Sequence, residues 1–203
     1  MTNTAVDALA AARDLLSTWS VSDAASESLR TQYLAWIAAH ADAPANALSR
    51  DCAPHHLTAS AIVMSADASE VALTLHPKFG RWLQTGGHIE TSDTDLAGAA
   101  LREAREESGI EALQIDPLPV TLSRHQARCW PGGDHLDVQF VARAPFGAAL
   151  TCSDESEAVA WFSVDALPPD TDDSVRALVS AARLRLRESP SPWLDGDIAP
   201  PTP

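Results

Sequence analysis

Three glutamates crowded on one turn of a predicted helix constrain this chain more than any other feature. Within the segment Arg102–Ile110, which reads REAREESGI, Glu103, Glu106 and Glu107 are spaced i, i+3 and i+4. At about 100° per residue this spacing places all three carboxylates on one side of a helix. Because like charges at this spacing weaken a helix, the pattern indicates either a bound divalent cation or a solvated acidic face.

The residues around the three glutamates favour the cation. Gly86-Gly87 lies upstream, Arg102 stands beside the first glutamate, and Gly109 is typical of a helix C-cap. Clustered carboxylate oxygens are hard ligands, which suit Mg²⁺ or Mn²⁺ rather than zinc. We therefore predict a Mg²⁺ or Mn²⁺ site on this helix.

These residues resemble the Nudix hydrolase signature, in which a glycine, five residues and an acid precede the pattern Arg-Glu-apolar-x-Glu-Glu-x-Gly-apolar. The second half matches without exception from Arg102 to Ile110. The first half departs twice, since Asp93 stands where the family usually has glutamate, and eight residues rather than seven separate Asp93 from Arg102. We expect the extra residue to lengthen the loop or the first helical turn and to leave the carboxylate spacing intact. The resemblance covers roughly residues 57–165.

The resemblance implies an α/β Nudix fold, with a mixed sheet sandwiched between helices, and cleavage of a diphosphate linkage, typically in a nucleoside diphosphate joined to another group. It implies that Glu106 and Glu107 bind the metal, with Glu103 as a further ligand or general base. Arg102 would hold a carboxylate in place, and the carbonyl of Gly86 or Gly87 would complete the coordination. The formal charge of -14 agrees, because bound cations would have to offset the repulsion of an anionic substrate.

The general base is open, because some members of the superfamily use a glutamate on a later loop. Glu157, four residues before Trp161, is our candidate for that role, and Glu155 is the next. A solvated loop acid explains Glu157 equally well.

Contacts to the substrate are expected from residues near the motif. Lys78, Arg81 and His88 could meet substrate phosphates, although solvated charges and a turn histidine are the alternatives. Trp82 and Trp130 could stack on a base, and Trp82 fits a core position better.

The three cysteines, at positions 52, 129 and 152, form no CxxC pair. An odd number without such spacing excludes a disulfide framework and suits a reducing cytosol. Cys52 with His55 and His56 suggests zinc, but further ligands lie far off in the sequence, so we do not expect a metal there. Cys129 and Cys152 are expected to be inert side chains.

Composition narrows the class of protein. The chain has 203 residues, 28 acidic and 14 basic side chains, and a pI of about 4.7. This balance argues against binding a nucleic acid duplex. No apolar run approaches the roughly 18 residues of a membrane helix, and we expect neither a signal peptide nor a membrane partner. The chain is predicted to be a cytoplasmic enzyme acting on a small phosphorylated molecule.

The pattern of elements divides the chain into three parts: a helical N-terminal extension over 1–50, the Nudix hydrolase domain over 51–188, and a proline-rich tail over 189–203 that is expected to be disordered. The extension should hold two helices, the second capped at Ser22-Asp23 and ending near Pro44. Its role as a lid, a dimer surface or a cover for the sheet is open, and a homodimer is one expectation. Strands are predicted over 57–64, 71–75, 81–84, 113–115, 120–125, 136–142 and 159–164, with Gly86-Gly87 as a turn and helices over 95–108 and 173–187.

Two alternatives to a hydrolase remain. The one-residue insertion leaves open a Nudix-fold module that binds a nucleotide or sugar-phosphate without turnover, although the intact Glu103, Glu106 and Glu107 argue against it. An isomerase of the same fold would need a reactive cysteine at the site, and nothing in the sequence places Cys52 there.

Overall fold

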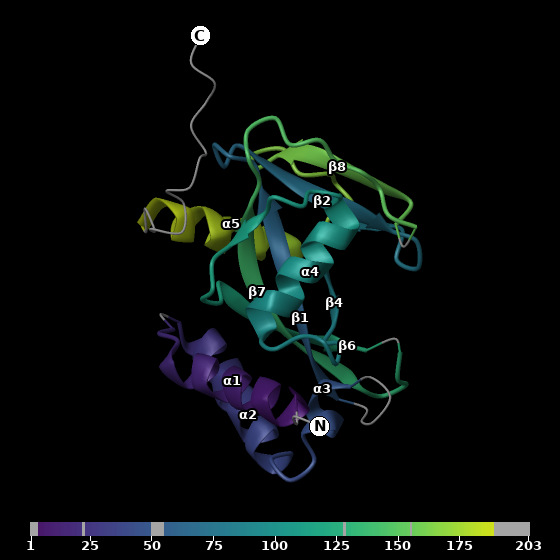
Figure 1. Cartoon of the computed structure of the whole chain (residues 1–203). Coiled ribbons are helices and arrows are strands. Elements are labelled where there is room, and N and C mark those ends of the chain that lie inside the picture. The colour runs from purple at the N-terminus through teal and green to yellow at the C-terminus, as the bar shows by residue number, and fades with distance from the viewer. Residues whose placement is uncertain (1–3, 22, 50–54, 128, 155, 189–203) are drawn as a thin grey trace.

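The computed structural model describes residues 4–21, 23–49, 55–127, 129–154 and 156–188. Helices cover both faces of one mixed sheet, as expected (Figure 1). The elements are α1 (Thr4–Thr18), α2 (Ala24–Ala39), α3 (Pro44–Leu48), β1 (His56–Met64), β2 (Glu70–His76), β3 (Arg81–Leu83), β4 (Thr85–His88), α4 (Leu96–Ser108), β5 (Gln114–Ile115), β6 (Thr121–Gln126), β7 (Asp134–Arg143), β8 (Ala158–Ser163) and α5 (Asp173–Glu188). The predicted tail, Cys52 and Glu155 lie outside the described residues.

Strand β1 organises the sheet. Along one edge it pairs in parallel with β7, from His56 opposite His135 to Met64 opposite Arg143. Along the other edge it pairs antiparallel first with β4 and then, at its end, with β2. Strands β3 and β8 extend the sheet beyond β2, whereas β5 and β6 both pair with β7. On this edge of β1, the sheet therefore splits into two branches: β4 pairs with the first part of β1, and β2 pairs with its end.

Alternate residues of β1 face two different cores. Ala61 packs in a cluster that also contains Ala104 of α4, whereas Ile62 packs in a second cluster with Leu178 of α5. Successive side chains of a strand point to opposite faces, so β1 is apolar on both sides. This accounts for its nearly continuous apolar sequence and for its position between the two helices.

The N-terminal helices pack on the same core as the sheet. Asp23 caps α2 as predicted, and its Oδ1 accepts hydrogen bonds from the backbone N–H groups of Ala25 (3.0 Å) and Ser26 (2.9 Å). Leu16 of α1 and Tyr33 of α2 are buried in the cluster that contains β1 and β7. These helices therefore cover part of the sheet, at the bottom of the view in Figure 1.

Two local predictions differ from the structure. Pro44 does not end α2, which stops at Ala39; it begins α3, where proline is tolerated because the first N–H groups of a helix have no partner within it. Gly86 and Gly87 lie in β4 rather than in a turn. At Gly86, where φ is 152°, a Cβ atom would lie 2.3 Å from Cβ of Ser60 on β1. Glycine is therefore needed there for close strand pairing.

Candidate active site

Helix α4 carries the three glutamates and has a defined start and end. Asp95 caps it by accepting a hydrogen bond from the N–H of Gly98 at 2.7 Å. Gly109 ends it with φ 72°, and its N–H donates to the carbonyl of Arg105 at 2.8 Å. Ala100 and Ala104 are fully buried against the sheet. The predicted helix and its C-cap are thus confirmed.

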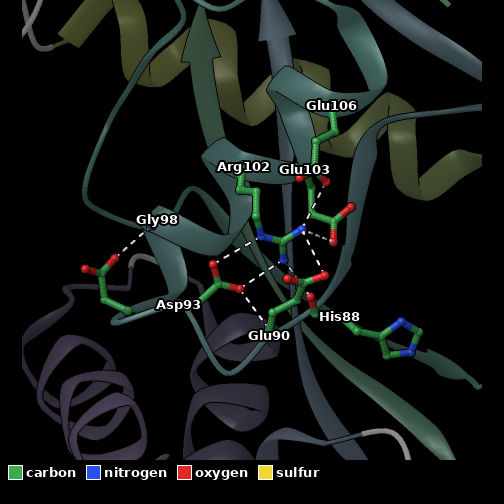
Figure 2. A network of polar contacts seen from close by, with 8 residues as sticks. His88, Glu90, Asp93, Gly98, Arg102, Glu103 and Glu106 are labelled. Carbon is green, nitrogen blue, oxygen red and sulfur yellow. Dashed lines mark hydrogen bonds and ion pairs between the residues drawn. The ribbon is translucent and has the colours of Figure 1, made fainter. Parts of the chain in front are cut away.

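Arg102, in the middle of this helix, donates hydrogen bonds to three carboxylates and forms an ion pair with a fourth, that of Glu90, at 3.9 Å (Figure 2). Arg102 donates from Nε and Nη2 to the two oxygens of Asp93, at 3.1 and 2.9 Å. Its Nη1 donates to Glu103 Oε1 and Glu106 Oε2, both at 3.0 Å, and Nη2 also reaches the carbonyl of His88 at 3.0 Å. Arg102 therefore fixes two of the glutamates relative to the end of β4.

Asp93, where the family usually has glutamate, is a central member of this network. Asp93 is only 9% exposed, and its Oδ2 also accepts a hydrogen bond from the backbone N–H of Glu90 at 2.8 Å. The side-chain hydrogen bond with Asp93 raises the pKa of Arg102 above its usual range. The carboxylate of Asp93 thus makes a two-point contact with the guanidinium group of Arg102, nine residues further along the chain.

A large cavity of about 1410 Å³ opens beside α4 and β4. It exceeds the roughly 300–1,000 Å³ of many small-molecule sites. Its lining includes nearly all of the predicted site residues, namely Lys78, Arg81, Gly87, His88, Arg102, Glu103, Glu106 and Glu107. Acidic side chains outnumber basic ones around it, so an anionic substrate would be repelled unless cations were bound.

Glu157 is the predicted site residue that the structure does not bring to this cavity. Its exposed side chain is not among the lining residues, and its N–H donates to the carbonyl of Leu75 at the start of β8. Its role as a base stays a prediction. Trp82 packs edge-on against Phe162 with ring centroids 4.7 Å apart, in agreement with the predicted core position, whereas Trp130 is exposed.

The donor set beside Gly87 fits a hard divalent cation. Glu103 and Glu106 approach the same nitrogen of Arg102, and Glu107 lines the same cavity. The carboxylate of Glu103 also lies against the backbone of Gly87 in β4. The backbone of β4, with its carbonyl groups, is therefore next to the acidic side chains. Oxygen donors of this kind suit Mg²⁺ or Mn²⁺.

The buried carboxylate of Asp137 also lines this cavity and was not predicted from the sequence. Asp137 on β7 is 3% exposed and accepts hydrogen bonds from Thr58 Oγ1 (3.0 Å), Ser60 Oγ (2.7 Å) and Gln139 Nε2 (2.9 Å). The available signal was polar residues at every second position of two otherwise apolar strands. That signal becomes informative only when the pairing of β1 with β7 is known.

A second polar cluster lies beside the cavity, and His88, Cys129 and His135 of this cluster line it. His56, His88, Cys129 and His135 offer ligand atoms that all lie within 4.8 Å of one another. Burial, reinforced by the neighbouring rings of His125, His56 and His88, lowers the pKa of His135 to about 3. Its ring is therefore neutral at neutral pH.

Comparison with known proteins agrees with this geometry. The family model described as the NUDIX domain matches residues 54–182. The chain belongs to the Nudix family. Solved structures support the Nudix fold: a Nudix-family hydrolase from Clostridium perfringens has a TM-score of 0.54 and 22% identity, covering 64% of this chain and 97% of that one. An Ap4A hydrolase from C. elegans, described as a binary complex, has a TM-score of 0.55 and 20% identity, covering 66% and 98%.

Curated relatives of this Nudix chain match it over part of its length. The NAD-capped RNA hydrolase NudC of Pseudomonas aeruginosa is 31% identical over 115 residues, or 56% of this chain and 38% of the relative. NudC of Pseudomonas fluorescens is 30% identical over a region of the same length. The match thus spans about two fifths of the length of these relatives. Among the residues described by the structure, no helix is long and apolar enough to cross a membrane.

Proposed function

We propose that this Nudix protein is a Mg²⁺- or Mn²⁺-dependent hydrolase that cleaves a diphosphate linkage in a nucleoside-diphosphate-linked substrate. The observation that carries the proposal is the convergence of Glu103 and Glu106 on Arg102, beside Gly87, in the wall of a cavity large enough for a nucleotide. A carboxylate cluster held by one arginine can neutralise a divalent cation, and a diphosphate needs that cation in so acidic a cavity.

Each residue of the network has a proposed role. Glu106, Glu107 and the Gly87 carbonyl hold the cation, and Glu103 is a further ligand or the general base. Arg102 keeps the glutamates in position through charge-assisted hydrogen bonds. When bound, the divalent cation supplies polarisation of a phosphoryl oxygen, activation of water and neutralisation of the leaving group.

Substrate phosphates are proposed to bind at the β2–β3 side of the cavity. Lys78 and Arg81 line it there, and apart from Arg102 they are the lysine and arginine residues among its described lining. His88 also lines the cavity, but its ring belongs to the cluster with His56, Cys129 and His135, so it is not assigned to a phosphate. The cavity is negatively charged overall, so the positive charges of Lys78 and Arg81 would attract phosphates locally. They favour a substrate whose phosphates extend from the metal to the β2–β3 side of the cavity.

The substrate class is proposed from chemistry and from one relative. A relative named NAD-capped RNA hydrolase acts, by its name, on a compound that contains a nucleoside diphosphate. This supports nucleoside diphosphates joined to a second group as the first compounds to test.

The experiment separates hydrolysis from binding alone. Purified protein is incubated with Mg²⁺ or Mn²⁺ and a panel of nucleoside triphosphates, dinucleotides and nucleotide sugars, and the products are separated by chromatography. We expect Glu106→Gln to lower kcat/KM at least about 100-fold, which is the lower range for a group that stabilises charge in a transition state. Glu111→Gln, on the exposed turn after α4, is the control and should keep full activity.

Two outcomes would contradict the proposal. Equal activity of the parent and Glu106→Gln would exclude the assigned carboxylates. Tight nucleotide binding without any metal-dependent product would favour the binding module instead. Glu103→Gln and Glu157→Gln, compared over pH, identify the base, because its removal abolishes the lower limb of the pH–rate profile.

A further inference from the structure

We propose that His56, His88, Cys129 and His135 form a second metal site that binds one Zn²⁺ in tetrahedral coordination, separate from the glutamates of α4. The four residues come from β1, β4, the β6–β7 loop and β7. The site would fasten an exposed loop to three strands of the sheet.

The strand register explains why the three histidines meet. His56 lies directly opposite His135 in the β1–β7 pair, and His88 lies opposite Thr58, two residues further along β1. Paired residues, and residues two apart on one strand, point to the same face of a sheet. The three rings therefore gather on the cavity side of β1.

The distances match the coordination that zinc prefers. Cys129 Sγ lies 3.3 Å from Nε2 of His135, 3.6 Å from Nε2 of His88 and 3.7 Å from Nε2 of His56. Zn–S bonds of about 2.3 Å and Zn–N bonds of about 2.0–2.1 Å at tetrahedral angles place the sulfur about 3.5 Å from each nitrogen. The observed distances lie on both sides of that value, so an ion fits with small movements.

The donor set selects the metal. One thiolate and three imidazoles are softer ligands than the carboxylates of α4, and they suit zinc rather than Mg²⁺. The sulfur carries at most one hydrogen, so at most one of its three contacts can be an S–H···N hydrogen bond. A cation between the four atoms would bind all of them at once. Four protein ligands make a closed site, which is typical of structural zinc.

Surrounding contacts support the site on both sides. His135 Nδ1 lies 3.3 Å from His125 Nε2, so a metal-bound His135 can donate its remaining ring hydrogen, as metal-bound histidines commonly do. The loop that carries Cys129 is closed by the N–H of Ala127, which donates to the carbonyl of Gly133 at 2.9 Å. His88 links the two sites, because its carbonyl accepts from Arg102 while its ring points away from that arginine (Figure 2).

The test measures metal content and the identity of the sulfur ligand. The full chain is stripped with chelator, reloaded with Zn²⁺, and dialysed against excess Mg²⁺ before elemental analysis. We expect one equivalent of zinc in the parent and in Glu106→Gln. We expect less than a tenth of an equivalent in Cys129→Ser, and for His125→Ala a loss of affinity of about 10–100-fold, as for other outer partners of metal ligands. With Co²⁺, the parent should show the thiolate charge-transfer band of a tetrahedral site.

Matched controls use the other two cysteines of the chain. Cys152→Ser and Cys52→Ser should keep both the zinc and the cobalt band, whereas Cys129→Ser should lose both and also the rise in melting temperature caused by zinc. Circular dichroism and melting in chelator check that Cys129→Ser folds like the parent. Zinc retained by Cys129→Ser, or a cobalt band lost in Cys52→Ser instead, would overturn the proposal. None of these readouts depends on hydrolase activity.

Discussion

The carboxylate of Glu103 lies directly against the α-carbon of Gly87. A Cβ atom at position 87 would be 2.6 Å from Oε1 and 2.7 Å from Cδ of Glu103. Because this carboxylate is also held by Arg102 at 3.0 Å, the glutamate is fixed between β4 and the arginine. Glycine at position 87 is thus a requirement of the site rather than of a turn.

Gly87→Ala is therefore expected to displace Glu103 while leaving the fold intact. The clashing atoms are the end of a flexible side chain, so the free energy of unfolding should change by less than about 1 kcal/mol. Misplacement of a catalytic group by about 1 Å can cost about 100-fold in rate, and we expect a loss of that size in metal-dependent hydrolysis. Gly98→Ala, at an exposed position of α4, is the control and should keep full activity. Parallel losses in both variants would contradict the explanation.

Arg102→Lys tests the network around Asp93. A lysine has a single ammonium and cannot reproduce the planar fork that reaches Asp93, Glu103 and Glu106. Since Asp93 is nearly buried, we expect about 1–3 kcal/mol of destabilisation in urea unfolding. Arg13→Lys alters an exposed pair with Asp14 and should change stability by less than about 0.5 kcal/mol. Similar unfolding midpoints for parent and Arg102→Lys would refute the role of the guanidinium.

Tyr33 should make the fold sensitive to alkali. It is fully buried, donates to the carbonyl of Ser123 at 2.7 Å, and burial raises its pKa above the usual range. The unfolded chain ionises near pH 10 while the folded chain keeps its proton, so stability is complete below about pH 10 and falls as pH rises above it. Tyr33→Phe should lose about 1 kcal/mol at pH 7 and show a weaker alkaline decline.

The same residue provides its own optical signal. Tyr33 is the chain's only tyrosine, so tyrosinate absorbance should appear together with unfolding, as followed by circular dichroism. Ionisation well before the loss of secondary structure would show that the hydroxyl is not protected as described.

Deletion of residues 1–48 should expose the main core. Leu9, Leu16 and Tyr33 are buried against the sheet, and each large apolar side chain contributes about 1.5–3 kcal/mol on burial. Their loss is comparable with the total stability of a typical domain, about 5–15 kcal/mol. We expect low solubility and a strongly reduced melting temperature, measured beside the full chain. A soluble truncated protein with an unchanged melting temperature would mean that the helices form a separate unit.

Local patterns predicted much of the fold. The helix that carries the glutamates, its end at Gly109, and the strands that became β1, β2 and β7 follow from periodicity and capping, which act within a few residues. The sequence predicts a turn at Gly86 and Gly87, which lie in β4 instead. The prediction is wrong because glycine is common both in turns and where two backbones approach closely. Only the pairing of β4 with Ser60 and its neighbours distinguishes the two.

The sequence by itself determined the acidic face of α4 and its resemblance to a hydrolase motif, because the spacing of Glu103, Glu106 and Glu107 is a property of one helix. Only the tertiary structure decided that Asp93 engages Arg102 and that Cys129 meets His56 across 73 residues. The physical reason is that these contacts depend on loop closure and strand register, which bring together residues of different elements and leave no periodic trace in the chain.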